Sequence, residues 1–168
     1  YMEESSYGPV RSVYKYMYER NKCNFRDYQN VAVNGACSYT ALDNIKRLSR
    51  DQQNDHPLLM FLELVGNDVC SHFQNFSNMT KPEAFKKSII QILDHLDTVA
   101  PAGSHLVILG LVNGSLIYEG VKGHIHPTGG TYEDFYDFTS CSEASFCWGW
   151  LNTNATGREK TTEFSMEL

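Results

Sequence analysis

The stretch that decides the fold is LLMFLELV at residues 58–65, which follows Pro57 and stops at Gly66, Asn67 and Asp68. An apolar run of this length, closed by turn residues, is typical of a central strand buried on both faces. Residues 106–112 read LVILGLV and predict a second strand of the same kind. Between them, residues 81–99 predict a helix, with Thr80 as its cap and a proline in its first turn.

A strand, a helix and a strand at this spacing form a crossover that builds parallel sheets. We therefore predict an α/β fold with helices on both faces of the sheet, in a single domain over residues 1–168. Further helices are predicted over residues 9–20, 38–49 and 132–141. Residues 27–33 are half apolar and end at an Asn34–Gly35 turn, and the chain beyond Asn154 is polar.

The composition excludes two classes of protein. The net charge is -6 and basic residues cluster only in pairs, whereas a nucleic-acid-binding surface needs a basic stripe. The mean hydropathy is -0.38, and no apolar run approaches the roughly 18 residues of a membrane span. The sequence predicts no nucleic-acid partner, no transmembrane segment and no cofactor.

The five cysteines contain no CxxC pair, which argues against a zinc ribbon or a thioredoxin motif. The six-residue spacing of Cys141 and Cys147 predicts a local disulfide between them. The pairing of Cys23, Cys37 and Cys70 stays open.

Four N-x-S/T sequons begin at Asn75, Asn78, Asn113 and Asn154, and each is a candidate glycosylation site. Asn75 and Asn78 are so close that a glycan on one would crowd the other. Four sequons in one domain favour a secreted or lumenal glycoprotein, including a vesicular or lysosomal one, where disulfides also form.

Two short segments are candidates for a binding site, because ligands of open parallel sheets bind beyond the carboxyl ends of the strands. One is Gly66–Asn67–Asp68 and the other is Asn34–Gly35–Ala36. A tetrahedral oxyanion needs donors such as an unobstructed glycine N–H and a side-chain amide, and both types occur here. The alternative for each segment is an ordinary turn.

Residues 30–36, NVAVNGA, resemble the second conserved block of the SGNH/GDSL esterases, and residues 61–68, FLELVGND, resemble the third. The resemblance implies a three-layer α/β/α fold with a flavodoxin-like, mostly parallel sheet. It also implies an oxyanion hole in which Gly35 gives a backbone N–H and Asn67 a side-chain N–H. The family's Gly-Asp-Ser and Asp-x-x-His blocks do not occur in these 168 residues. The chain is therefore expected to be an interior part of such a domain, without the nucleophile.

More narrowly, residues 62–70 (LELVGNDVC), 126–129 (HPTG) and 147–150 (CWGW) resemble family members that remove acyl chains from bacterial lipopolysaccharide. This implies a segment of a secreted lipid-ester serine hydrolase. Its substrate would be a lipid or lipopolysaccharide-like acyl ester, and the full-length protein would carry a saposin-like lipid-binding part.

His124 and His126 alternate in a glycine-rich loop. His126 is a candidate for shaping the acyl-chain cleft, or else a hydrogen-bonded loop residue. A metal site is not predicted, because no third ligand stands beside the pair.

Two other functions compete with the hydrolase. One is a non-catalytic SGNH-like structural or interaction glycoprotein. The other, a flavodoxin-like binding domain, lacks a phosphate-cradling glycine-rich loop.

Overall fold

The computed structural model describes residues 4–5, 8–9, 11–70, 75–110 and 113–168. They group into two units, Tyr1–Val31 and Ala32–Leu168, where the sequence led us to expect one domain. Each unit is described by itself.

The first unit consists of short elements held by aromatic rings. Strands β1 (Glu4–Ser5) and β2 (Gly8–Pro9) pair antiparallel, and helix α1 (Val13–Arg20) is followed by the 3-10 helix η1 (Lys22–Asn24). Helix α1 begins later than predicted because Ser12 caps it, accepting a hydrogen bond from the Lys15 amide at 3.1 Å. The Tyr14 and Tyr28 rings pack with centroids 4.9 Å apart.

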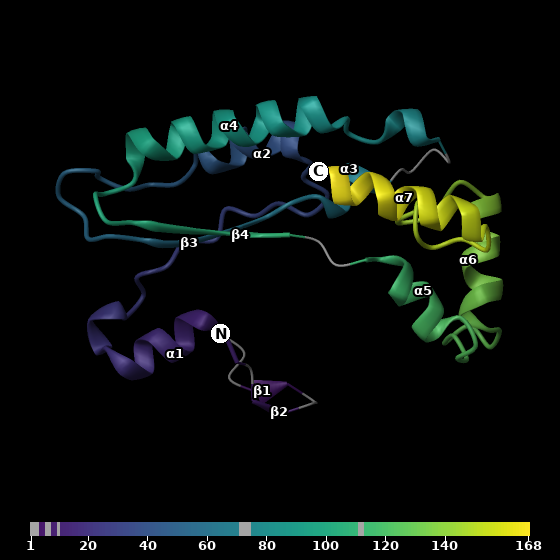
Figure 1. Cartoon of the computed structure of the whole chain (residues 1–168). Coiled ribbons are helices and arrows are strands. Elements are labelled where there is room, and N and C mark those ends of the chain that lie inside the picture. The colour runs from purple at the N-terminus through teal and green to yellow at the C-terminus, as the bar shows by residue number, and fades with distance from the viewer. Residues whose placement is uncertain (1–3, 6–7, 10, 71–74, 111–112) are drawn as a thin grey trace. The chain divides into compact units, whose positions relative to one another are not determined.

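The second unit is built on two parallel strands, β3 (Leu59–Glu63) and β4 (His105–Leu109), paired from Leu59↔His105 to Glu63↔Leu109. Helices α2 (Ser38–Ile45) and α4 (Pro82–Val99) lie together over one face of this sheet (Figure 1). Ala41, Ile45, Ile92 and Leu96 form the buried core there, packed against apolar side chains of both strands. The predicted α/β class and its crossover are confirmed.

The opposite face of the sheet differs from the prediction. Leu59 is 43% exposed and Phe61 is 50% exposed on this face, so within the described residues of this unit the strands are covered on one face only. The second helix layer of the predicted three-layer arrangement is not among the described residues of this unit. The unit is therefore a partial α/β fold, and residues 111–112 of the predicted second strand lie outside the described residues.

Three helices complete the second unit: α5 (Ser115–Val121), α6 (Tyr132–Cys141) and α7 (Ala155–Glu167). Helix α6 has the predicted bounds, fixed by a capping box between Thr131 and Asp134. Helix α7 was not predicted, since it carries no apolar stripe. It is held instead by the buried Arg158, which bonds Glu119 at 2.7 Å and lies 3.9 Å from the centre of the Tyr118 ring.

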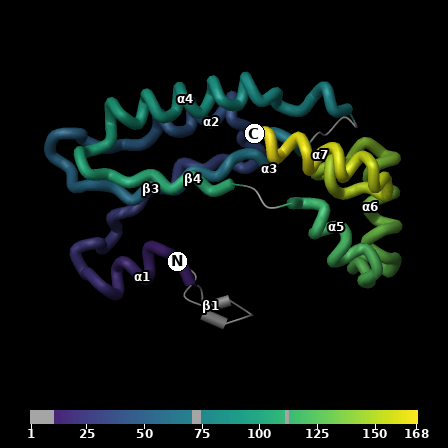
Figure 2. Tube along the Cα trace, in the orientation of Figure 1, coloured from purple at the N-terminus to yellow at the C-terminus, as the bar shows by residue number. Residues whose placement is uncertain are grey.

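Helix α7 runs back to the short helix α3 (Gly66–Val69) at the end of the sheet (Figure 2). A second core cluster joins the two regions and comprises Val65, Val69, Met79, Phe85, Cys147 and Trp150. The 3-10 helix η2 (Phe76–Asn78) precedes α4 in the chain. No helix in the described ranges is long and apolar enough to cross a membrane.

The disulfide in this cluster joins Cys70 to Cys147, and the predicted Cys141–Cys147 bond is wrong. Cys141 ends α6 as an exposed free thiol, whereas packing brings the Cα atoms of Cys70 and Cys147 to 4.2 Å. Because the two cysteines are 77 residues apart, tertiary packing and not sequence spacing determines that Cys147 pairs with Cys70.

Candidate functional site

Asn67 lies directly beyond the carboxyl end of β3. Val65 turns the chain there with a φ of 51°, a conformation that costs a β-branched residue energy. The Gly66 amide donates to the Leu64 carbonyl across this turn, and α3 begins at once. The turn presents Asn67 as an exposed residue at the strand end, where ligands of such sheets bind.

Gly35 occupies the tip of a turn just before α2. Its φ is 79°, which favours glycine, and the Ala36 amide closes the turn on the Val33 carbonyl at 3.1 Å. No atom lies within 4 Å of the position that a Cβ would take. Among the described residues, none accepts a hydrogen bond from the Gly35 amide, and Gly35 is exposed. Residues 27–33 before it form no strand.

The structure brings the two predicted segments into direct contact. The Asn67 side-chain amide donates to the Ala36 carbonyl at 2.9 Å, and the Cys37 thiol donates to the Asn67 carbonyl at 3.5 Å. We call the bonds joining residues 36–38 to residues 67–68 the loop clamp. One Asn67 N–H is taken by Ala36, and the described residues take no other, so the second can serve an outside acceptor.

The buried part of the loop clamp is a carboxylate. Asp68 is 2% exposed, and it accepts the Ser38 amide at 3.1 and 3.0 Å and the Ser38 hydroxyl at 2.6 Å. Ser38 is itself fully buried as the first residue of α2. Asp68 thus holds the start of α2, whose N-cap residue is Cys37.

Cys37 carries a free thiol inside the loop clamp. Burial raises the pKa of this thiol, the charge of Asp68 adds to the effect, and a hydrogen bond with Tyr39 offsets part of it. The raised pKa favours the protonated thiol, which donates to the Asn67 carbonyl.

These segments fall inside a match to a known family. The sequence profile of the GDSL-like Lipase/Acylhydrolase family covers residues 5–113, which include Gly35 and Asn67. The chain belongs to this family. The predicted resemblance to the SGNH/GDSL esterases is confirmed.

Curated proteins that align with the whole chain or nearly all of it are acyloxyacyl hydrolases. The chain is 35% identical to the Mus musculus acyloxyacyl hydrolase over 174 residues, covering 100% of the chain and 30% of the relative. It is 37% identical to the Homo sapiens acyloxyacyl hydrolase over 164 residues, covering 94% of the chain and 28% of the relative. The chain thus spans about a third or less of the length of these relatives.

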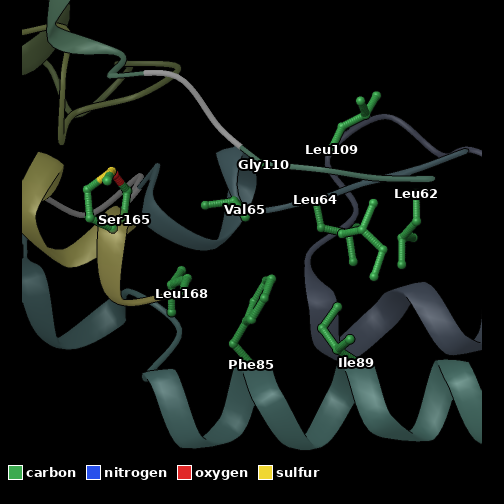
Figure 3. Close-up of a pocket in the computed structure, with 11 residues that line it drawn as sticks. Leu62, Leu64, Val65, Phe85, Ile89, Leu109, Gly110, Ser165 and Leu168 are labelled. Atoms are coloured by element: carbon green, nitrogen blue, oxygen red, sulfur yellow. The ribbon is translucent and has the colours of Figure 1, made fainter.

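A cavity of about 280 Å³ lies close to the candidate site along the chain. Val65, two residues before Asn67, lines it. Figure 3 shows around it Leu62 from β3 and Leu64 just after that strand, Phe85 and Ile89 from α4, and Leu168, the residue after α7. Ser165 is the one polar side chain in its lining, and no charged side chain is among the described residues there. Such a space suits a hydrocarbon group better than a polar one.

His126 lies in the loop before α6. Its ring stacks on Phe135 with centroids 3.9 Å apart, meets Tyr132 edge-on, and contacts the Thr128 hydroxyl at 2.8 Å. These contacts are within its own loop and α6, so the cleft role stays a proposal. In the described parts of the chain, no three His, Cys, Asp or Glu side chains gather as metal ligands would.

The sequons lie in different surroundings. Asn75, Asn78 and Asn154 are exposed, whereas Asn113 is half-buried. The Asn113 side chain accepts hydrogen bonds from the Ser115 and Thr162 hydroxyls at 2.6 and 3.0 Å. Glycosylation at all four stays a prediction.

Proposed function

We propose that this chain supplies the oxyanion hole of a serine esterase that hydrolyses acyl esters of lipids. The observation that carries the proposal is the bond from the Asn67 amide to the Ala36 carbonyl, which holds the Asn67 side chain against the residue that follows Gly35. Gly35 and Asn67 are the two donor types that such a hole requires, and both are solvent-accessible.

In the proposed reaction, a serine oxygen attacks the ester carbonyl carbon while a histidine takes its proton. The carbonyl oxygen becomes an oxyanion, which accepts hydrogen bonds from the Gly35 amide and the Asn67 side chain. Collapse of this intermediate expels the alcohol, which takes the proton from the histidine. Water then releases the acyl group as a carboxylic acid. The serine and histidine belong to the two family blocks that this sequence does not contain.

The proposed substrate is a fatty acyl ester of the acyloxyacyl type, in which one acyl chain is esterified to a hydroxyl group of another. The name of the relatives supports this class, and so does the apolar lining of the cavity beside Val65, which fits an alkyl chain. We extend the proposal to a lipopolysaccharide-like lipid, with a saposin-like part elsewhere in the full-length protein. His126, stacked on Phe135, would border the cleft.

We also propose a secreted or lumenal location. The Cys70–Cys147 disulfide supports it, because such bonds persist in oxidising compartments. The exposed sequons at Asn75, Asn78 and Asn154 agree with passage through the secretory route.

The test uses the full-length protein, labelled with a fluorophosphonate and assayed on fatty acyl esters. Asn67→Ala is expected to lower kcat by about 10²-fold or more with the fold intact, since a lost oxyanion donor costs this much. Asn54→Ala is the control, because its exposed amide bonds only Asp51 of its own loop. Equal turnover in Asn67→Ala and Asn54→Ala would refute the role of Asn67. Absence of both labelling and turnover in the unaltered protein would support the non-catalytic glycoprotein instead.

A further inference from the structure

We infer that Asp68 is a positioning residue, which fixes the Gly35 turn relative to Asn67 by holding Ser38. This inference rests on the proposed oxyanion hole and assigns the part that sets its geometry. Asp68 directly follows Asn67, and Ser38 stands three residues after Gly35. Each partner of the buried bond therefore lies within three residues of one of the two donors.

The bond between these partners is the strongest part of the loop clamp. Both carboxylate oxygens of Asp68 are engaged by Ser38, at 3.1, 3.0 and 2.6 Å, away from competing water. Hydrogen bonds to an ionised acceptor are shorter and stronger than bonds between neutral groups. The other ties are weaker, namely one amide bond at 2.9 Å and one thiol bond at 3.5 Å.

The carboxylate also holds the start of a helix. Ser38 begins α2, whose Ala41 and Ile45 are buried against α4, so the far end of the Gly35 turn is anchored in the core. The Asp68 carbonyl in turn accepts the Thr80 amide at 2.9 Å, which ties it to the residues before α4. Asp68 therefore links both sides of the oxyanion site to rigid elements.

A direct chemical role for Asp68 does not fit its surroundings. The carboxylate is 2% exposed, and Ser38 occupies both of its oxygens. A carboxylate buried in this way does not face the open site where a substrate would lie. Its effect on catalysis must pass through the positions of Gly35 and Asn67.

The experiment compares Asp68→Asn and Ser38→Ala with Thr40→Ala in the full-length protein. Thr40 is the matched control, because its hydroxyl accepts the Cys37 amide at 3.1 Å at the same end of α2 without touching Asp68. We expect Asp68→Asn and Ser38→Ala to lower kcat by about 10- to 100-fold with KM within about twofold, since a misplacement of 1 Å can cost that much. The double variant should be no worse than Asp68→Asn alone, because the pair acts as a unit. Thr40→Ala should keep kcat within about twofold.

NMR of the same variants separates this inference from the proposed function. Asp68→Asn and Ser38→Ala are expected to shift the Gly35 amide and Asn67 side-chain resonances, and Thr40→Ala to leave them in place. Ser38→Ala retains the backbone bonds to Asp68, so it keeps the test valid if Asp68→Asn fails to fold. Unmoved resonances, or a kcat loss equal to that of Thr40→Ala, would overturn the positioning role. A parent protein that shows neither turnover nor labelling would overturn the proposed function. The NMR shifts of Gly35 and Asn67 would then be the test of whether Asp68 fixes the positions of these two residues.

Discussion

Removal of the Cys70–Cys147 disulfide is expected to cost the chain a large part of its stability. The bond closes a loop of 77 residues, for which the loop-entropy relation gives about 4.5 kcal/mol of lost stabilisation at 25 °C. Cys147 is also buried in the cluster with Trp150, so the double variant Cys70→Ala/Cys147→Ala loses sulfur packing as well. With an m-value of about 2 kcal/mol/M, the urea midpoint should fall by roughly 2 M.

The assay is urea unfolding followed by circular dichroism and tryptophan fluorescence, with Cys141→Ser as the control. Cys141 is exposed and unpaired, so its replacement should leave the midpoint unchanged. A non-reducing peptide map should contain one linked peptide pair that joins Cys70 to Cys147. The reasoning is refuted by a Cys141–Cys147 peptide, or by a double variant that loses less than about 1 kcal/mol.

Three further outcomes follow from single contacts. Arg158→Ala should lower the free energy of unfolding by about 2–3 kcal/mol in urea titrations, because its buried guanidinium bonds the carbonyl of the buried Asn152 and packs on the Tyr118 ring, and alanine replaces neither contact; an unchanged midpoint would contradict this. The Cys37 thiol should be alkylated by iodoacetamide more slowly than the exposed Cys141 thiol. Its alkylation rate should rise only at pH values above those at which an ordinary thiol ionises, since burial raises the pKa of Cys37. Equal alkylation rates of the two thiols at pH 8 would contradict this prediction. Material secreted from a eukaryotic host should lose mass at exposed Asn154 on treatment with peptide N-glycosidase, and half-buried Asn113 should remain unmodified; a glycan found at Asn113 would show that its side chain is not held as described.

The sequence predicts those parts of the fold that depend on local patterns. The bounds of α6 and the βαβ crossover follow from caps and apolar runs, and the structure confirms them. Helix α7 escapes such reasoning because its buried residues are Gly157, Arg158 and Thr161, which form no apolar stripe. Their burial depends on Glu119 and Tyr118, which no local window contains.

The same limit applies to the strands and the cysteines. An apolar run such as residues 58–65 shows that both faces of a strand are apolar, but it cannot say what covers the face that carries Phe61. Spacing along the chain favoured Cys141 as the partner of Cys147, whereas packing of α3 against the later segment selected Cys70.

The candidate site also combines features that local sequence predicts with contacts that only the fold provides. Its two segments are predicted from their places after apolar runs, and the family resemblance implies their donor roles, but the bonds that join them span about 30 residues.

Helix α3 explains why these long-range contacts bear on the site. It has four residues, Gly66–Val69, and a single helical turn has no stability of its own in water. Its position is therefore set by outside ties: Asn67 to Ala36, Asp68 to Ser38, and Cys70 through the disulfide to the segment before Trp150. Because the donor Asn67 stands between these ties, stability and proposed function share the same few bonds. A change that loosens one tie should move the proposed oxyanion site before it unfolds the core, since Val69 of the same helix is fully buried in the core cluster.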